Sequence, residues 1–384
     1  MNKGLRIFIV VLVSATLIIC TFYLSVAFLF TGRSIYLIPC FLIIFLFIAQ
    51  FRIRVIGKTR SKRTDFVTIA ALVLLTCITI YREVPKIYAN YVGRIGNDIN
   101  IREYAPFEMD TKAIHLPETS SFILTQNLPR LDGATALYPV YSAFAQAVYP
   151  ERDYSPWNSV VLCSKTSRAY ENLLDNKVDI IFAAAPSKDH LEIAASLGLS
   201  FELTPIGKEA FVFFVNKKNS VDNVTVKQIK DIYSGKITHW NQISEEGGTI
   251  IPFQRPANSG SQTMLEKIMG DQRIMEARKE DVVGGMGGVI QRAANYTNYK
   301  NSIGYSFLFF ATEMANNDQI RLLKIEGIEP NKRTIKNKTY PFSGSFYAIT
   351  IKEHKSHKNV DLLINWVLSS QGQYIIEKTG YLPL

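Results

Sequence analysis

The residues best suited to chemistry in this chain lie in one short stretch, residues 255–263, which reads Arg-Pro-Ala-Asn-Ser-Gly-Ser-Gln-Thr. The Ser-Gly-Ser opens an amphipathic run typical of a helix, and the free backbone N–H groups at a helix start favour an anion. The hydroxyls of Ser259, Ser261 and Thr263 add donors, and Arg255 adds a permanently charged planar fork. The stretch therefore predicts a site for an oxyanion.

A second helix start of this kind lies at residues 132–139, Asp-Gly-Ala-Thr-Ala-Leu-Tyr-Pro, which suggests that a ligand is held between the two. Each start also has a simpler explanation. Ser259 and Gln262 have the spacing of a capping box, and Thr135 is equally well read as a plain N-cap. Capping does not explain Arg255. An arginine usually lies at the surface, but the Ser-Gly-Ser beside this one favours a ligand.

The elements that must position these residues begin near residue 118, where short β-like runs alternate with helical ones. Strands are expected at residues 122–125, 160–163, 178–183, 211–215, 250–254, 303–310 and 346–351. Helices are expected at residues 137–148, 168–174, 187–197, 225–235, from 259 onward and at 360–368. Strands alternating with helices predict an α/β fold with parallel pairing.

The N-terminal part has a different character. Residues 1–65 hold nine Lys and Arg against one acid, which is most of the net charge of +10. Uncharged apolar runs predict three transmembrane helices, at about residues 7–31, 34–51 and 66–84. The first run is longer than the apolar core of a cleaved signal peptide, which is the competing interpretation. The basic cluster between the second and third runs predicts a cytoplasmic N-terminus and an extracytoplasmic location from about residue 85 onward.

Several functional classes find no support in the sequence. The remaining chain is nearly neutral, so no basic surface for nucleic acid is expected. We find no nucleophile elbow, zinc-protease helix or nucleotide loop, and we predict neither an enzyme nor a cofactor. His354 and His357 are flanked by lysines, which argues against a metal site. Cys163 is the single cysteine beyond the apolar runs, so no disulfide can form within the large domain.

Four motifs in order, at residues 207–216, 232–241, 255–263 and 303–306, resemble the phosphate-binding proteins of bacterial phosphate ABC transporters. The likeness spans residues 116–384 and excludes the apolar N-terminal runs. It implies a two-lobe, periplasmic-binding-protein-like α/β domain whose lobes are joined by crossover hinge strands and close on one oxyanion. Together with the apolar runs, this predicts a membrane region at 1–84, a linker at 85–117 and a domain at 118–384. Lobe 1 takes residues 118–215 and 340–384, and lobe 2 takes residues 216–339.

Carried over position by position, the resemblance implies ligand donors from both lobes. They are the Thr135 hydroxyl, the Ala136 N–H, Ser164, Arg255, Ser259, Gly260 and Ser261. One departure concerns residues 183–187, Ala-Ala-Ala-Pro-Ser, where the family usually places a ligand-facing aspartate. The identity of the anion is therefore less firmly implied than the anion site itself.

The resemblance implies a binding protein that captures inorganic phosphate or a related oxyanion for an ABC permease, and the apolar N-terminal runs predict that it is anchored in the membrane. The alternative is a membrane-tethered anion sensor that signals through a membrane partner and has no transport role.

Overall fold

The computed structural model describes residues 99–245, 247–294, 300–354 and 358–384, which all belong to one compact unit, Val92–Leu384. The three predicted membrane spans, at about residues 7–31, 34–51 and 66–84, lie outside the described residues. Among the helices that are described, none has both the length and the apolar character needed to cross a bilayer.

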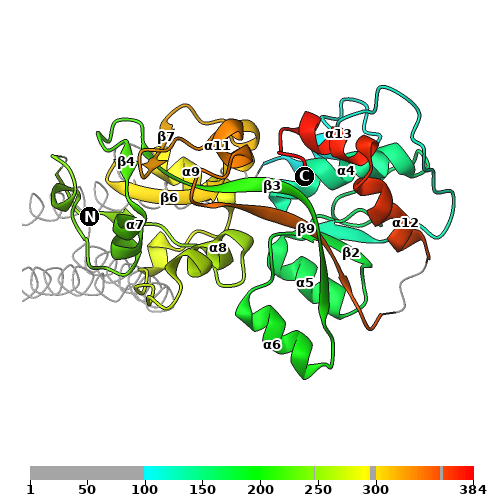
Figure 1. The fold of residues 1–384 in the computed structure, drawn as a ribbon, viewed down its shortest axis with the longest axis horizontal. Helices are drawn as coiled ribbons and strands as arrows, with labels where there is room; N and C mark the ends of the chain where they lie inside the picture. The colour runs from blue at the N-terminus through cyan, green and yellow to red at the C-terminus, as the bar shows by residue number, and fades with distance from the viewer. Residues whose placement is uncertain (1–98, 246, 295–299, 355–357) are drawn as a thin grey trace, which may run out of the picture. The chain divides into compact units, whose positions relative to one another are not determined.

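Two long strands, β3 (Phe201–Asn216) and β9 (Ser343–Ile351), connect two groups of elements and run antiparallel to each other (Figure 1). Their pairing extends from Phe201 opposite Ile351 to Ala210 opposite Ser343. The second half of β3 leaves β9 and pairs antiparallel with β6 (Ser302–Phe307). Because one strand belongs to both groups, β3 and β9 form the crossover between two lobes.

Lobe 1 packs its helices around a short parallel pair and β9. The pair is β1 (Leu131–Gly133) with β2 (Ile180–Ala183), and β2 continues the sheet to β9. The helices are α4 (Tyr138–Val148), α5 (Thr166–Leu174), α6 (Lys188–Ser196), α12 (Lys358–Val367) and α13 (Ser370–Thr379). Tyr141 stacks on Phe182 at 5.0 Å between ring centroids, so α4 is packed directly on β2.

Lobe 2 is built on β6, which pairs with β3 and, in parallel, with β5 (Ile251–Pro252). The other strands are β4 (Asn223–Val224), β7 (Ile320–Leu322) and β8 (Lys324–Ile325). The helices are α7 (Val226–Tyr233), α8 (Gly260–Met269), α9 (Met286–Ala294) and α11 (Lys332–Lys336), with a π-helical turn at Phe310–Met314. Fully buried aromatic side chains, including Phe213, Tyr233, Trp240 and Tyr305, form its core.

The helix predictions succeed where local capping decides the structure. Thr225 and Gln228 form the predicted capping box of α7, and Gly235 follows the helix with φ of +78°, which suits glycine. Ser187 caps α6 as predicted. The helix α13 was not predicted from the sequence.

The strand predictions need correction in three places. Residues 122–125 form no strand, and residues 160–163 contribute only an isolated bridge from Val161 to Leu131. The predicted strand 303–310 ends at Phe307. The pairing is mixed and not wholly parallel, because the chain leaves lobe 1 along β3 and returns along β9 in the opposite direction.

Candidate functional site

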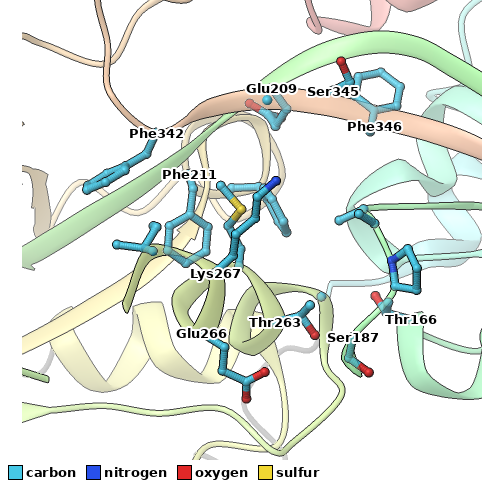
Figure 2. A pocket seen from close by; sticks show the side chains of 18 of the residues that line it. Thr166, Ser187, Glu209, Phe211, Thr263, Glu266, Lys267, Phe342, Ser345 and Phe346 are labelled. Carbon is cyan, nitrogen blue, oxygen red and sulfur yellow. The ribbon is translucent and has the colours of Figure 1, made fainter. Parts of the chain in front are cut away.

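A cavity of about 860 Å³ lies between the two lobes, beside the crossover strands (Figure 2). Lobe 1 contributes Ala136, Thr166 and residues 184–187 to its wall, and lobe 2 contributes Gly260 and Thr263. The crossover strands contribute Glu209 and Phe211 from β3 and Phe346 from β9, among others. In Figure 2 Thr166 and Ser187 lie on one side, Thr263 lies opposite on α8, and the hinge residues lie along the strands above.

Three helix starts contribute to this cavity. The short 3-10 turn Thr135–Leu137 leads directly into α4, and neither this turn nor α5 has a side-chain cap at its beginning. The α8 start lies close to the α5 start, because a Cβ added to Gly260 would stand 3.0 Å from the Thr166 hydroxyl oxygen. Only glycine fits at position 260 without displacing Thr166. The two lobes therefore meet at helix ends that carry positive partial charge.

A second contact joins the lobes through the Asn258 side chain. The Ser187 hydroxyl donates to Asn258 Oδ1 at 2.8 Å, and Asn258 Nδ2 donates to Asp189 Oδ2 at 3.1 Å. Asn258 has φ of +62°, a conformation that asparagine tolerates better than most residues. The Asn258 side chain of lobe 2 thus accepts a hydrogen bond from Ser187 and donates one to Asp189, both at the start of α6 in lobe 1.

Arg255 is 9% exposed and lies in the loop before α8. Its backbone N–H donates to Gln262 Oε1 and to the Tyr305 hydroxyl, both at 3.0 Å, and Tyr305 donates to Gln262 at 2.5 Å. The guanidinium Nη1 donates to the Val283 carbonyl at 2.5 Å. The loop is therefore held from both sides, and the arginine side chain is positioned in advance of any ligand.

The same contacts correct the predicted capping box at Ser259. Ser259 Oγ accepts the Gln262 N–H at 3.4 Å, which is the first half of the box. The Gln262 side chain instead supports Arg255, so the reciprocal half is not formed. Ser261 is 1% exposed, and its hydroxyl has no hydrogen-bond partner among the described residues. A buried hydroxyl of this kind leaves a donor without an acceptor next to Gly260, which lines the cavity.

The buried Asp132 carboxylate organises the lobe 1 loops. It accepts the N–H groups of Gly133 and Ser164 at 2.8 Å, the Asn172 amide at 2.8 Å and the Ser164 hydroxyl at 2.5 Å. The predicted ligand hydroxyl of Ser164 is thus donated to Asp132. Thr135 is half-buried beside it, and Ala136 lines the cavity.

Glu209 lies in the cavity wall on β3, opposite Gly344 on β9. Burial raises the pKa of Glu209 to about 8, against the opposing effect of N–H donors from Ala210 at 2.8 Å and Phe309 at 3.4 Å. This carboxyl is therefore protonated near neutral pH. Glu266 and Asp271 also line the cavity, but both are exposed to solvent.

Of the predicted site residues, Ala136 and Gly260 line the cavity, whereas Thr135, Ser164, Arg255, Ser259 and Ser261 are not among the residues that line it. Thr166, Ser187 and Asn258 were not predicted as site residues. Thr166 had a usable signal, because it follows a strand-like run and opens a helix two residues after Ser164. No local signal identifies Asn258, whose partners come from the other lobe.

Comparison with known proteins gives a consistent result. Residues 125–371 match the PBP superfamily domain. The chain is 25% identical over 186 residues to the phosphate-binding protein PstS of Borreliella burgdorferi, covering 47% of this chain and 65% of that protein. It is also 25% identical over 226 residues to PstS of Staphylococcus epidermidis, covering 56% and 67%.

Solved structures agree on the fold. A phosphate ABC transporter substrate-binding protein from Clostridium perfringens, crystallised with bound phosphate, superposes with a TM-score of 0.51 at 23% identity, covering 66% of this chain and 98% of that chain. An ABC-type phosphate transport receptor from Vibrio cholerae gives 0.50 at 16% identity, covering 66% and 99%. These similarities establish a shared two-lobe architecture.

Proposed function

Since the chain belongs to the PBP superfamily, we propose that it is a solute-binding protein that captures an oxyanion, inorganic phosphate in the first instance, for uptake by an ABC permease. The observation that carries the proposal is the meeting of the α5 and α8 starts at one cavity, with the buried Ser261 hydroxyl unsatisfied beside them. The phosphate-binding relatives support the choice of anion. Binding and release complete the function, with no covalent step.

The proposed ligand set keeps the residues predicted from the sequence. Lobe 2 contributes Arg255, Ser259, Gly260 and Ser261, and lobe 1 contributes the Thr135 hydroxyl, the Ala136 N–H and Ser164. In this proposal lobe 1 is residues 118–215 with 340–384, and lobe 2 is residues 216–339. Bending of β3 and β9 separates and joins the lobes. The register irregularity between Pro205 and Gly207 gives β3 a place to bend.

The direct test is calorimetric titration of the full-length protein in detergent with inorganic phosphate. We expect saturable binding at one site together with a rise in the melting temperature, because a ligand that binds only the folded state stabilises it. Absence of both binding heat and stabilisation at millimolar phosphate would refute the proposal.

Asn258 provides a test of lobe closure. Asn258→Gly preserves the positive φ and removes both contacts to α6, so phosphate affinity should fall by about 1 kcal/mol, roughly fivefold. The loss should appear mainly as faster dissociation, measured by stopped-flow release.

A side-chain exchange controls for effects on folding. Asn258→Asp places a carboxylate against Asp189 and should weaken phosphate binding further. Adding Asp189→Asn restores the hydrogen bond in the reverse direction, because the amide at position 189 can donate to the carboxylate at position 258. The double variant should recover most of the affinity. If it bound no better than Asn258→Asp alone, closure would not depend on this contact.

We also propose that the binding domain is extracytoplasmic and anchored by three N-terminal membrane helices. The support is the position of the basic cluster between the second and third apolar runs. A membrane-impermeant thiol reagent applied to intact cells should label a cysteine introduced at Asn97 and spare one introduced at Gly57, in a chain without its native cysteines. Labelling at Gly57 alone would reverse the topology.

A further inference from the structure

The cavity is large for an inorganic oxyanion. Its volume of about 860 Å³ lies toward the upper end of the roughly 300–1,000 Å³ typical of pockets that hold drug-sized organic ligands. The lobes already touch at Gly260 with Thr166 and at Asn258 with Ser187, so the volume is not simply that of widely separated lobes. A free phosphate ion would fill only a small part of it.

The cavity has two chemically different ends. The helix starts at Ala136, Thr166 and Gly260 form a polar end suited to a phosphoryl group. The crossover strands form the other end, where the aromatic rings of Phe211, Phe342 and Phe346 line the wall (Figure 2). Apolar side chains of α8 and the segment after it, such as Met264 and Ile274, extend this surface.

Gly344 leaves a gap in the aromatic wall. Alternation along β9 places position 344 on the same face as Phe346, and Phe342 lies in the turn directly before the strand. Gly344 also lines the cavity, and a Cβ added there would meet nothing within 4 Å. The glycine therefore leaves open, solvent-accessible space at this point of the cavity wall, beside the buried Phe346 side chain.

The charge of the aromatic end also suits an uncharged group. Glu209 is the carboxyl beside Gly344, and burial raises its pKa to about 8, so it carries a proton near neutral pH. Two lysines, Lys188 and Lys267, and two acids, Glu266 and Asp271, also line the cavity, and all four side chains are exposed to water. Among the described residues that line the hinge end, none is therefore a buried carboxylate that is ionised near pH 7.

From this geometry we propose that the site takes phosphate monoesters with a compact apolar or aromatic group. The phosphoryl group lies at the helix starts, and the organic group lies against the hinge aromatics around Gly344. This inference rests on the proposed function, because it uses the same anion site. It adds the chemical class of the ligand, inferred from the part of the cavity that a phosphate ion would leave empty.

The test compares phenyl phosphate with inorganic phosphate in calorimetric titrations of the full-length protein. Burial of a phenyl ring against an apolar wall should make phenyl phosphate bind about tenfold more tightly or better. Gly344→Leu fills the gap and should weaken phenyl phosphate at least tenfold while inorganic phosphate changes less than twofold. Gly247→Leu adds the same side chain at an exposed glycine outside the cavity and should change neither affinity.

The outcomes separate the two proposals. If inorganic phosphate binds and phenyl phosphate binds no more tightly, the ligand class is wrong and the proposed function stands. If Gly344→Leu weakens both ligands equally, the organic group does not lie at the hinge, and the inference fails. If neither ligand binds to a protein that melts cooperatively, the proposed function itself fails.

Discussion

Arg255→Ala is expected to weaken phosphate binding by about 2–5 kcal/mol, which corresponds to roughly 30-fold to several-thousand-fold in Kd. Arg255 is buried in the loop before the α8 start, and a charge-assisted contact in a closed cleft is worth more than one in water. The effect should be large because the loop is held in place before binding, by Gln262 and Tyr305 at the Arg255 N–H. Isothermal titration of the parent and the variant measures the loss.

Two further variants distinguish the effects of the Arg255 charge and of its planar geometry on affinity from a general loss of folding. Arg255→Lys keeps the charge and loses the planar fork, so its affinity should lie between those of the parent and the alanine variant. Thr135→Ala should cost only about 1 kcal/mol, because backbone donors at that helix start remain. The contacts of the Arg255 N–H persist in both arginine variants, but Arg255→Ala also removes the guanidinium contact to the Val283 carbonyl, so the melting temperature of each variant is measured beside its affinity. Equal affinity of parent and Arg255→Ala would show that the anion binds elsewhere.

The sequence is sufficient where short-range physics determines the structure. The caps at Ser187 and Thr225 need only residues within one helical turn, and both helices begin as predicted. The run 211–215 was predicted as a strand because it is continuously apolar, but β3 extends back to Phe201. Its first half mixes exposed and buried residues and includes Pro205 and Gly207. Only the pairing with β9, more than a hundred residues later, makes it a strand.

The same distinction applies to the candidate site. The Arg255 loop could be predicted because its donor types stand close together in sequence. The use of the Ser164 hydroxyl by Asp132 could not be predicted, because these residues meet through the tertiary bridge between Leu131 and Val161. The side chain of Gln262 was assigned to a cap, but it is recruited by Tyr305 on β6. Residues distant in sequence thus bind the side chains of Ser164 and Gln262, for which local sequence alone predicts other roles.

The absence of a carboxylate from the 183–187 loop has a consequence for selectivity. Phosphate near neutral pH carries a proton that can be donated to a carboxylate, and sulfate carries none. Asp132 cannot serve as the acceptor without giving up contacts, since Gly133, Ser164 and Asn172 already donate to it. Glu209 lies at the hinge and is protonated near pH 7, so it does not repel a dianion there. Residues 184–186 line the cavity and offer no acid.

We therefore expect sulfate to compete with phosphate within about tenfold at pH 5 to 7, whereas a site built to accept a ligand proton discriminates by about 10⁴–10⁵. Competition by sulfate against bound phosphate at pH 5 to 7 measures this ratio, and direct titration with sulfate from pH 5 to 9 measures how its own affinity depends on pH. The sign of the pH dependence follows from Glu209, whose raised pKa means that it gains charge only as pH passes about 8. Sulfate binding should weaken above that pH in the parent and stay nearly constant in Glu209→Gln, which keeps an acceptor for the Ala210 and Phe309 N–H groups. Strong exclusion of sulfate already at pH 6 would mean that another carboxylate faces the ligand, and it would overturn the assignment of this anion site as one without an acidic acceptor.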